Sequence, residues 1–448
     1  MNDRCKPRFF CPKTSMLRAT FALSLSTLIA LTLRGLAEDF QGSTHKLEYD
    51  SDPINYSSST PTDPVALAQK KLKASKNKGW LDFDPKYGYL PAMLELFNVP
   101  ISSQMFVFSK TSVQRHNINP DNPRALYFSD TIYIGFIPGA PVLEIASVDP
   151  KLGAVFYTVN QDKDEPVRFR RDENCLNCHG AARSMGVPGF VLRSLDTERN
   201  GEPVSGTESE AVTHFTPIEQ RWGGWYVTGA PAEWMHRGNR PGVPDPISEA
   251  EFQEKVKAAN YMGKGSELLP LLVHDHQVHM HNYFTRLNFE ARLALETYGH
   301  LRYLKRPLNA FLRYLLFAEE APLPSPISKD TPFASDFLKH AHRDSKGRSL
   351  RDLDLETRLF KYPCSFLIES DGFQQLPEPL RDLALRKLWE VLTGQNQDPD
   401  FASISPESRR AVLEILRETL ANLPAYWKQD GPSETSTPTP SSEPAPGE

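Results

Sequence analysis

Five consecutive residues near the middle of the chain, Cys175-Leu176-Asn177-Cys178-His179, combine two thiols and an imidazole at a fixed spacing. The pattern C-x-x-C-H is the attachment signature of c-type haem. The two thiols add across the haem vinyl groups, and the neighbouring imidazole is then held beneath the iron as its proximal ligand. The chain holds one such pattern. The sequence therefore predicts one covalently attached haem c, bound through Cys175 and Cys178, with His179 on the iron.

Other uses of a close cysteine pair fit this sequence less well. A zinc site would need a second pair of ligands at similar spacing, and the chain has no second C-x-x-C. A thioredoxin-like redox pair belongs at the start of a helix in a βαβ unit, which the surrounding residues do not indicate. Two buried structural thiols remain an alternative, although they would be a liability in an oxidising compartment. Cys364, in the segment YPCSFLIE, is expected to be a small buried hydrophobe.

The residue on the other side of the iron largely decides what a haem protein does. A methionine there raises the potential, a histidine lowers it, and an open position admits exogenous ligands. The candidates for this distal ligand are Met280, His276 and His236. Met280 lies in the middle of the apolar stripe of an expected helix and His276 at its edge, so core packing is the alternative for Met280. Met185 is too close to the motif in sequence for its sulfur to cross the ring.

Four histidines fall within eight residues of that expected helix, at positions 274, 276, 279 and 281. At 100° per residue, 274 and 281 share one face and 276 and 279 another, so one ion cannot collect all four. A solvated or capping role is therefore expected for these side chains. Arginines could also pair with the haem propionates, although each of them could equally face solvent. The candidates are Arg170, Arg171, Arg183 and Arg193.

The N-terminal segment has the features of an export signal. Basic residues precede an uncharged run of fifteen residues, 19–33, which is shorter than the roughly 20 residues of a membrane-spanning helix. Gly35-Leu36-Ala37 places small residues at −3 and −1 of a cut after Ala37. We expect residues 1–37 to be a signal peptide, with an uncleaved anchor as the alternative, and the chain to be periplasmic or otherwise exported. The mature chain would keep no membrane span and three cysteines, an odd number that cannot be a disulfide framework.

Composition and local patterns indicate how the motif is positioned. With 448 residues and 39% hydrophobic residues, we expect two or three domains with real cores. Expected strands are 125–137, 142–148, 154–159, 190–195 and 224–227, and expected helices are 64–75, a segment capped at Ser248, 268–296, 306–319, 350–361, 378–393 and 406–422. The prediction is an α+β fold, in which an antiparallel β-rich domain, 79–245, carries the haem motif and a helical domain, 246–428, follows. A flexible lead-in, 38–78, and a disordered Pro/Ser/Thr tail, 429–448, flank them.

Seven segments spread between residues 80 and 425 carry a resemblance to a known family. They are SQMFVFSKTSVQ, PRALYFSDTIYIGF, FRRDENCLNCHG, VPGFVLRS, IEQRWGGWYVTG, DHQVHMHN and RLFKYPCSFLIES. In this order they resemble large exported bacterial proteins that are usually described only as cytochrome c domain-containing. The resemblance implies a c-type haem on Cys175, Cys178 and His179, and it implies no activity. It also makes the stretches around His236 and 276–282 haem-pocket candidates, whereas a turn and an edge strand are expected at 222–226.

These observations predict an exported mono-haem cytochrome c that transfers electrons to or from an unidentified redox protein. An alternative is a haem-based sensor or a peroxidase-like enzyme with an open distal site, and a third is a binding protein whose haem is only structural. Without residues 1–37, which carry six basic side chains and one acidic one, the chain has a net charge of −10. A mildly acidic body without a basic stripe argues against a nucleic-acid partner.

Overall fold

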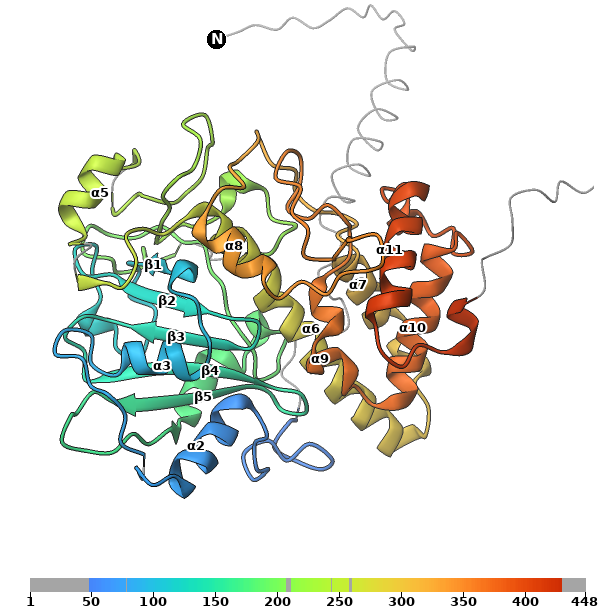
Figure 1. Ribbon diagram of the computed structural model, residues 1–448, viewed down its shortest axis with the longest axis horizontal. Helices are drawn as coiled ribbons and strands as arrows, with labels where there is room; N and C mark the ends of the chain where they lie inside the picture. The colour runs from blue at the N-terminus through green and yellow to red at the C-terminus, as the bar shows by residue number, and fades with distance from the viewer. Residues whose placement is uncertain (1–47, 78, 207–210, 243, 258–259, 429–448) are drawn as a thin grey trace, which may run out of the picture. The chain divides into compact units, whose positions relative to one another are not determined.

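The strand-forming segments lie between residues 105 and 226 and form one antiparallel sheet of seven strands (Figure 1). A computed structural model describes residues 48–77, 79–206, 211–242, 244–257 and 260–428, all of them within one compact unit. The strand order across the sheet is β6-β5-β4-β3-β2-β1-β7. The strands are β1 Met105–Val107, β2 Arg124–Phe128, β3 Ile132–Phe136, β4 Val142–Asp149, β5 Gly153–Asn160, β6 Arg170–Arg171 and β7 Trp225–Tyr226.

The helices follow the sheet for the most part, which confirms the α+β fold class. They are α2 Pro64–Ala74, α3 Leu90–Leu96, α4 Leu176–His179, α5 Glu249–Lys255, α6 Leu268–Tyr298, α7 Lys305–Leu315, α8 Pro332–Leu338, α9 Asp371–Gln374, α10 Glu378–Leu392 and α11 Pro406–Thr419. The cap expected at Ser248 is confirmed as a capping box at the start of α5, and Ser405 is the N-cap of α11. Among the described residues, no helix combines the length and apolar character needed to cross a bilayer.

Two expected elements are absent from the described part of the chain. Residues 350–361 form turns instead of a helix, because the Asp354 carboxylate accepts hydrogen bonds from the backbone N–H groups of residues 356–358 and Leu355 takes a positive φ of 60°. Residues 190–195 make only an isolated bridge between Arg193 and Ala211. The edge strand expected within 224–227 is confirmed as β7, which pairs with β1.

The segment before the sheet is packed rather than flexible where it is described. Tyr49, Ile54 and Tyr56 are buried, and the Tyr56 hydroxyl donates to the backbone oxygen of Ala154 at 2.7 Å. The free energy gained by burying these three apolar side chains holds the segment in place, although most of the residues around them are polar. The expected helix follows as α2, and the rest of the expected lead-in, the signal segment 1–37 and the tail 429–448 lie outside the described residues.

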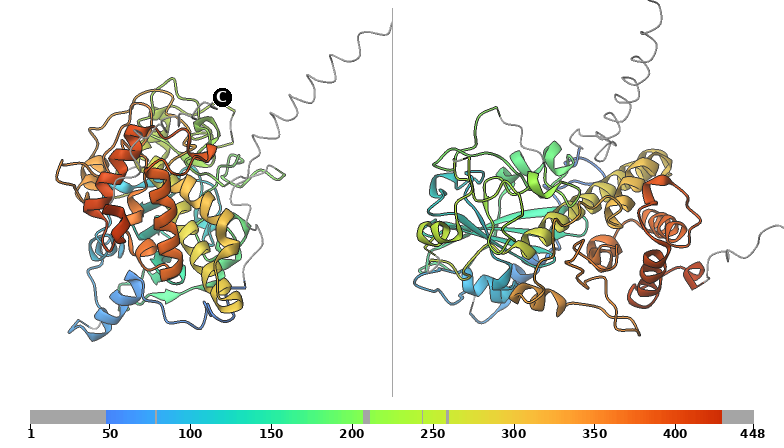
Figure 2. Two further views of the ribbon diagram at one scale, coloured as in Figure 1. Left: turned by 90° about the vertical axis from the view of Figure 1, so that its right-hand side faces the viewer. Right: turned by 90° about the horizontal axis from the view of Figure 1, so that it is seen from above.

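Helix α6 lies between the sheet and the other C-terminal helices (Figures 1 and 2). It packs against β5 on one side and against α7, α8 and α9 on others. Every side chain from Leu268 to Phe289 is buried as a result. The four histidines of this helix are therefore not solvated, which corrects the expectation from sequence. The division at residue 245 into a β-rich and a helical domain stays a prediction.

Candidate functional site

The C-x-x-C-H motif follows directly from the edge of the sheet. Strand β6 pairs with β5, and the chain then turns over the sheet through Asp172, whose carboxylate caps the short turn Glu173–Cys175. The single helical turn α4 comes next and ends at His179. Cys175 and Cys178 are three residues apart, which places both thiols on one side of this turn. Both are free cysteines; Cys175 is half-buried and Cys178 is exposed.

The His179 imidazole is held in one orientation and one tautomer. Its Nδ1 lies 3.0 Å from the backbone oxygen of Gly189, so Nδ1 carries the proton and donates it. Nε2 makes no hydrogen bond to a described residue and is left as the basic nitrogen. Burial lowers the pKa of His179, which favours the neutral imidazole that ligates metals. An outer N–H···O=C bond of this kind is typical of metal-bound histidines.

Helix α6 supports the loop that orients His179. The Asn282 side chain accepts a hydrogen bond from the Phe190 N–H at 2.7 Å and donates one to the Phe190 backbone oxygen at 2.8 Å. Arg286 donates to the backbone oxygen of Met185 at 2.9 Å. A Cβ on Gly189 would collide with Asn282, so only glycine permits this approach. Helix α6 therefore fixes the loop that carries Gly189, and this loop fixes the His179 imidazole.

The sheet presents a partly open surface beside the motif. Strand register places Leu126, Gly135, Glu144 and Thr158 in one row across β2, β3, β4 and β5. The side chains of Leu126, Glu144 and Thr158 are half-exposed, as is Ala146 in the next row, although these are central strands. Their neighbours on the opposite face, at positions 125, 127, 143, 145 and 159, are buried. This half-exposed surface is called the floor below.

Charged side chains lie at the floor and near the motif. Burial raises the pKa of Glu144, but Arg124, which lies 2.9 Å away, and hydrogen bonds from Ser112 and Gln114 outweigh burial and leave that pKa below its usual value. Burial, together with the charge of Arg183, lowers the pKa of Arg193, and Cys178 is near enough to oppose this shift.

The four arginines singled out from sequence separate into two groups. The electrostatic influence of Arg183 and Cys178 on Arg193 places Arg183 and Arg193 near the motif. Arg170 is exposed and pairs with Thr158 of the floor row. Arg171 instead points to the opposite face, where it donates to the backbone oxygens of residues 56, 57 and 59 and stacks on Tyr56. Arg171 is therefore committed to holding the N-terminal segment.

Two of the three predicted distal ligands face away from the motif. Both ring nitrogens of His276 are engaged, with His214 Nδ1 at 2.8 Å and Ser365 Oγ at 2.7 Å. Met280 is 0% exposed. It lies about 40° from His276 and about 160° from Asn282 around the helix. The helix therefore turns Met280 and His276 away from the loop that holds His179.

The third predicted ligand, His236, has contacts of another kind. Its ring packs edge-on against Trp222 at 5.8 Å, and its Nδ1 is buried without a hydrogen-bond partner among the described residues. Burial lowers the pKa of His236 to about 4. None of the contacts described for this ring involves Cys175, Cys178 or His179.

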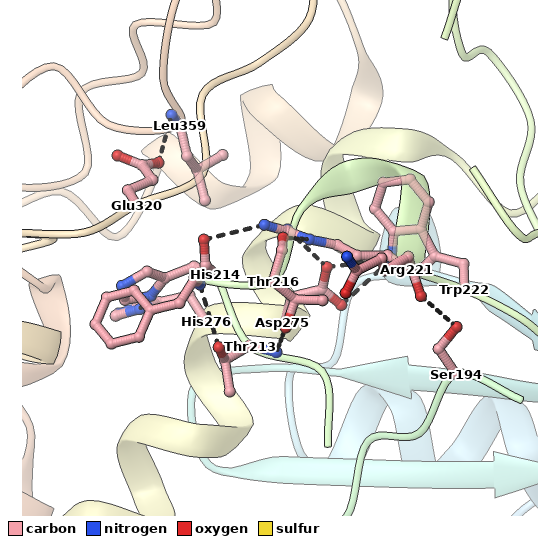
Figure 3. A network of polar contacts seen from close by, with 12 residues as sticks. Ser194, Thr213, His214, Thr216, Arg221, Trp222, Asp275, His276, Glu320 and Leu359 are labelled. Atoms are coloured by element: carbon pink, nitrogen blue, oxygen red, sulfur yellow. Dashed lines mark hydrogen bonds and ion pairs between the residues drawn. The ribbon is translucent and has the colours of Figure 1, made fainter. Parts of the chain in front are cut away.

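A buried polar network, which sequence reasoning missed, anchors α6 (Figure 3). Arg221 and Asp275, 2% and 0% exposed, form an ion pair at 3.0 Å, and Trp222 donates to Asp275 at 3.1 Å. Arg221 also donates to the backbone oxygens of His214 and Thr216. Burial raises the pKa of Asp275 to about 7, and Arg221 and Trp222 oppose that rise. Arg221 and Asp275 both lie in segments that resemble the family, which was the available sign of their importance. Their pairing could not be predicted, because they are 54 positions apart in the sequence.

Two neighbouring cavities lie elsewhere on the molecule. They have volumes of about 340 Å³ and 180 Å³ and share Asp130, His340 and Arg351 as lining residues. Arg351 pairs with Asp130 and stacks on the rings of Phe337 and Phe366. No motif residue lines either cavity. Within the described ranges, no group of three or more His, Cys, Asp or Glu side chains is placed to hold a metal ion.

No protein-family model, no curated protein and no solved structure matches this chain.

Proposed function

We propose that this chain is an exported c-type cytochrome with one covalently bound haem, and that it transfers electrons. The observation that carries the proposal is the arrangement at the motif. Cys175 and Cys178 are unpaired on one helical turn, and His179 keeps Nε2 free while Nδ1 donates to Gly189. These residues fit a haem: the thiols would hold it through thioether bonds, and His179 would ligate its iron. The bound group would supply one-electron chemistry.

The chain's own residues would orient and surround that group. The Gly189 carbonyl holds the proton on His179 Nδ1, and Asn282 fixes the loop that carries this carbonyl. Arg183 and Arg193 would pair with the haem propionates. The export-like N-terminal segment and the family-like segments support the same proposal, since haem is attached to C-x-x-C-H outside the cytoplasm. A redox protein is the proposed partner, and the acidic body argues against nucleic acid.

The alternative function, a haem sensor or a peroxidase-like enzyme, is favoured by one specific observation. His276 is hydrogen-bonded through both ring nitrogens, and Met280 lies on the same side of α6. Two residues that would close the iron are therefore committed elsewhere. An iron without a distal protein ligand can bind small molecules, as a sensor or a peroxidase requires. Electron transfer requires only that the iron be stable in two oxidation states.

The test is expression of the full chain together with haem-attachment machinery, followed by haem staining on a denaturing gel. We expect the wild type to retain haem after denaturation and the double variant Cys175→Ala/Cys178→Ala to lose it. Cys364→Ala is the matched control and should retain haem, because Cys364 is buried in another part of the chain. Haem that survives denaturation in the double variant, or a wild type without covalent haem, would overturn the proposal. Carbon monoxide binding by the reduced protein would favour the sensor or peroxidase-like function.

A further inference from the structure

Two histidines of α6, His274 and His281, stand over the same face of the sheet as the motif, since both rings contact Tyr133. The His274 ring packs against Phe128 at 5.4 Å, Tyr133 at 5.8 Å and Trp225 at 6.0 Å between ring centroids. Phe128 pairs with Tyr133 in the strand register, Tyr133 with Ala146, and Ala146 with Phe156. These four residues therefore form one row on one face.

The other end of this row carries the motif. The Phe156 ring lies 4.7 Å from the ring of His179. His179 thus stands over β5 and His274 over β2 and β3. Three strand spacings separate β5 from β2, about 14 Å.

The floor lies between the two histidines. Ala146, a small half-exposed residue, occupies the middle of their row, and half-exposed Leu126 and Glu144 lie in the next row. Large side chains thus flank a central strip that is not filled by the sheet itself. A group bound over Ala146 would lie between the part of the row that His179 contacts, at Phe156, and the part that His274 contacts, at Phe128 and Tyr133.

The His274 ring lacks the hydrogen bonds that a buried imidazole normally makes. The residue is 6% exposed, and its Nδ1 is buried without a partner among the described residues. Its Nε2 likewise makes no hydrogen bond within the described ranges. By contrast, His276 uses both nitrogens. His281 also has a buried Nδ1 without a partner among the described residues, but its Nε2 is held on the Asp130 backbone oxygen at 2.9 Å, so of the two only His274 has no ring hydrogen bond. A buried polar group without a partner is costly and calls for a ligand that pairs with it.

We infer that His274 is the second axial ligand of the haem iron, opposite His179. This inference rests on the proposed function. It replaces Met280, His276 and His236 as the distal residue, and it assigns a closed iron with two imidazoles to the chain. Such an iron has a lower reduction potential than one with a methionine ligand, and it suits electron transfer better than small-molecule binding.

The experiment compares His274→Ala with wild type in the full chain, co-expressed with haem-attachment machinery. Haem staining after denaturation comes first, and we expect both proteins to carry covalent haem. The oxidised wild type should show a six-coordinate low-spin spectrum, and its reduced form should not bind carbon monoxide. His274→Ala should lose the low-spin signal, bind carbon monoxide, and regain the low-spin signal when free imidazole is added.

His279→Ala is the matched control. His279 is also a buried histidine of α6, but its ring packs against Tyr283 and Tyr314 on the side that faces α7. The low-spin spectrum of the His279→Ala variant should therefore equal that of the wild type. If His274→Ala fails to fold, His274→Met answers the same question, since a methionine at this position should add a sulfur-to-iron absorption band.

Each outcome has one meaning. A low-spin spectrum that is unchanged in haem-bearing His274→Ala or His274→Met, or a wild type that binds carbon monoxide, would overturn the role of His274 while leaving the haem in place. A wild type without covalent haem would instead overturn the proposed function, at the first step.

Discussion

At the scale of single residues, the pair of Arg221 and Asp275 offers the sharpest test of stability. Arg221→Met would leave the Asp275 carboxylate buried with only the Trp222 N–H as a side-chain partner. Loss of one partner of a buried ion pair costs about 3–5 kcal/mol, because the remaining charge is not solvated. We therefore expect a loss of that size in the free energy of unfolding, measured by urea titration.

The control uses the same substitution at an exposed pair. Arg343 lies 3.0 Å from Asp352, with its side chain 44% exposed. Arg343→Met should change the free energy of unfolding by less than about 1 kcal/mol. Equal effects of the two substitutions would show that Arg221 and Asp275 are not a buried structural pair.

The residues of the candidate site were predictable from sequence only where the chemistry is local. Cys175, Cys178 and His179 lie within five residues, so their spacing alone indicated their use. The apolar stripe gave core packing as the alternative for Met280, but a stripe identifies the buried face only when the other side of the helix meets water. Helix α6 is buried on all sides along most of its length. The position of His274 depends on its packing against strands that lie about 140 residues earlier in the chain. No local sequence pattern encodes such a distant contact.

At the scale of elements, the contact between β5 and α6 can be tested at one glycine. Gly153 begins β5 with φ of +77°, and a Cβ there would collide with Thr285 of α6 and the backbone oxygen of Pro188. Gly153→Ala should incur left-handed strain of about 1–2 kcal/mol and overpacking of about 1–3 kcal/mol. We therefore expect the free energy of unfolding to fall by the sum of these two costs.

Gly139 provides a control that separates these two costs. Its φ is +79°, and a Cβ there would meet nothing within 4 Å. Gly139→Ala should therefore show the strain alone. If the two variants lose equal stability, α6 does not pack closely against the start of β5.

Helices were predicted correctly where the hydrophobic period and the capping residues agreed. Prediction failed where side chains, rather than a neighbouring strand, pair with the backbone. Helices α6, α10 and α11 lie close to their expected ranges. Residues 190–194 do alternate between buried and less buried positions, as a strand does. However, the Phe190 backbone pairs with the Asn282 side chain in place of a neighbouring strand. A distant amide that satisfies the backbone is invisible in the local pattern.

At the scale of the whole molecule, the burial of α6 couples stability to pH. Burial lowers the pKa of His214, lowers that of His279 to about 3 and lowers that of His281 to about 4. The unfolded chain takes up protons at these histidines near pH 6.5, whereas the folded chain does not, so stability is present above that pH and is lost as the pH falls. The raised pKa of Asp275 acts in the opposite direction, because the folded state binds its proton more readily.

The expected outcome is a steep loss of stability in mild acid. Each of the three histidines contributes about 1.4 kcal/mol per pH unit below about pH 6.5. The urea midpoint of the double variant Cys175→Ala/Cys178→Ala, which lacks the two candidate attachment thiols, should therefore fall between about pH 7 and pH 5. His279→Phe, in a pocket with Tyr283 and Tyr314, should make this dependence shallower, whereas His116→Gln at an exposed position should leave it unchanged. A midpoint that stays constant over this range would mean that the buried imidazoles are paired with acceptors and already charged, contrary to their lowered pKa values.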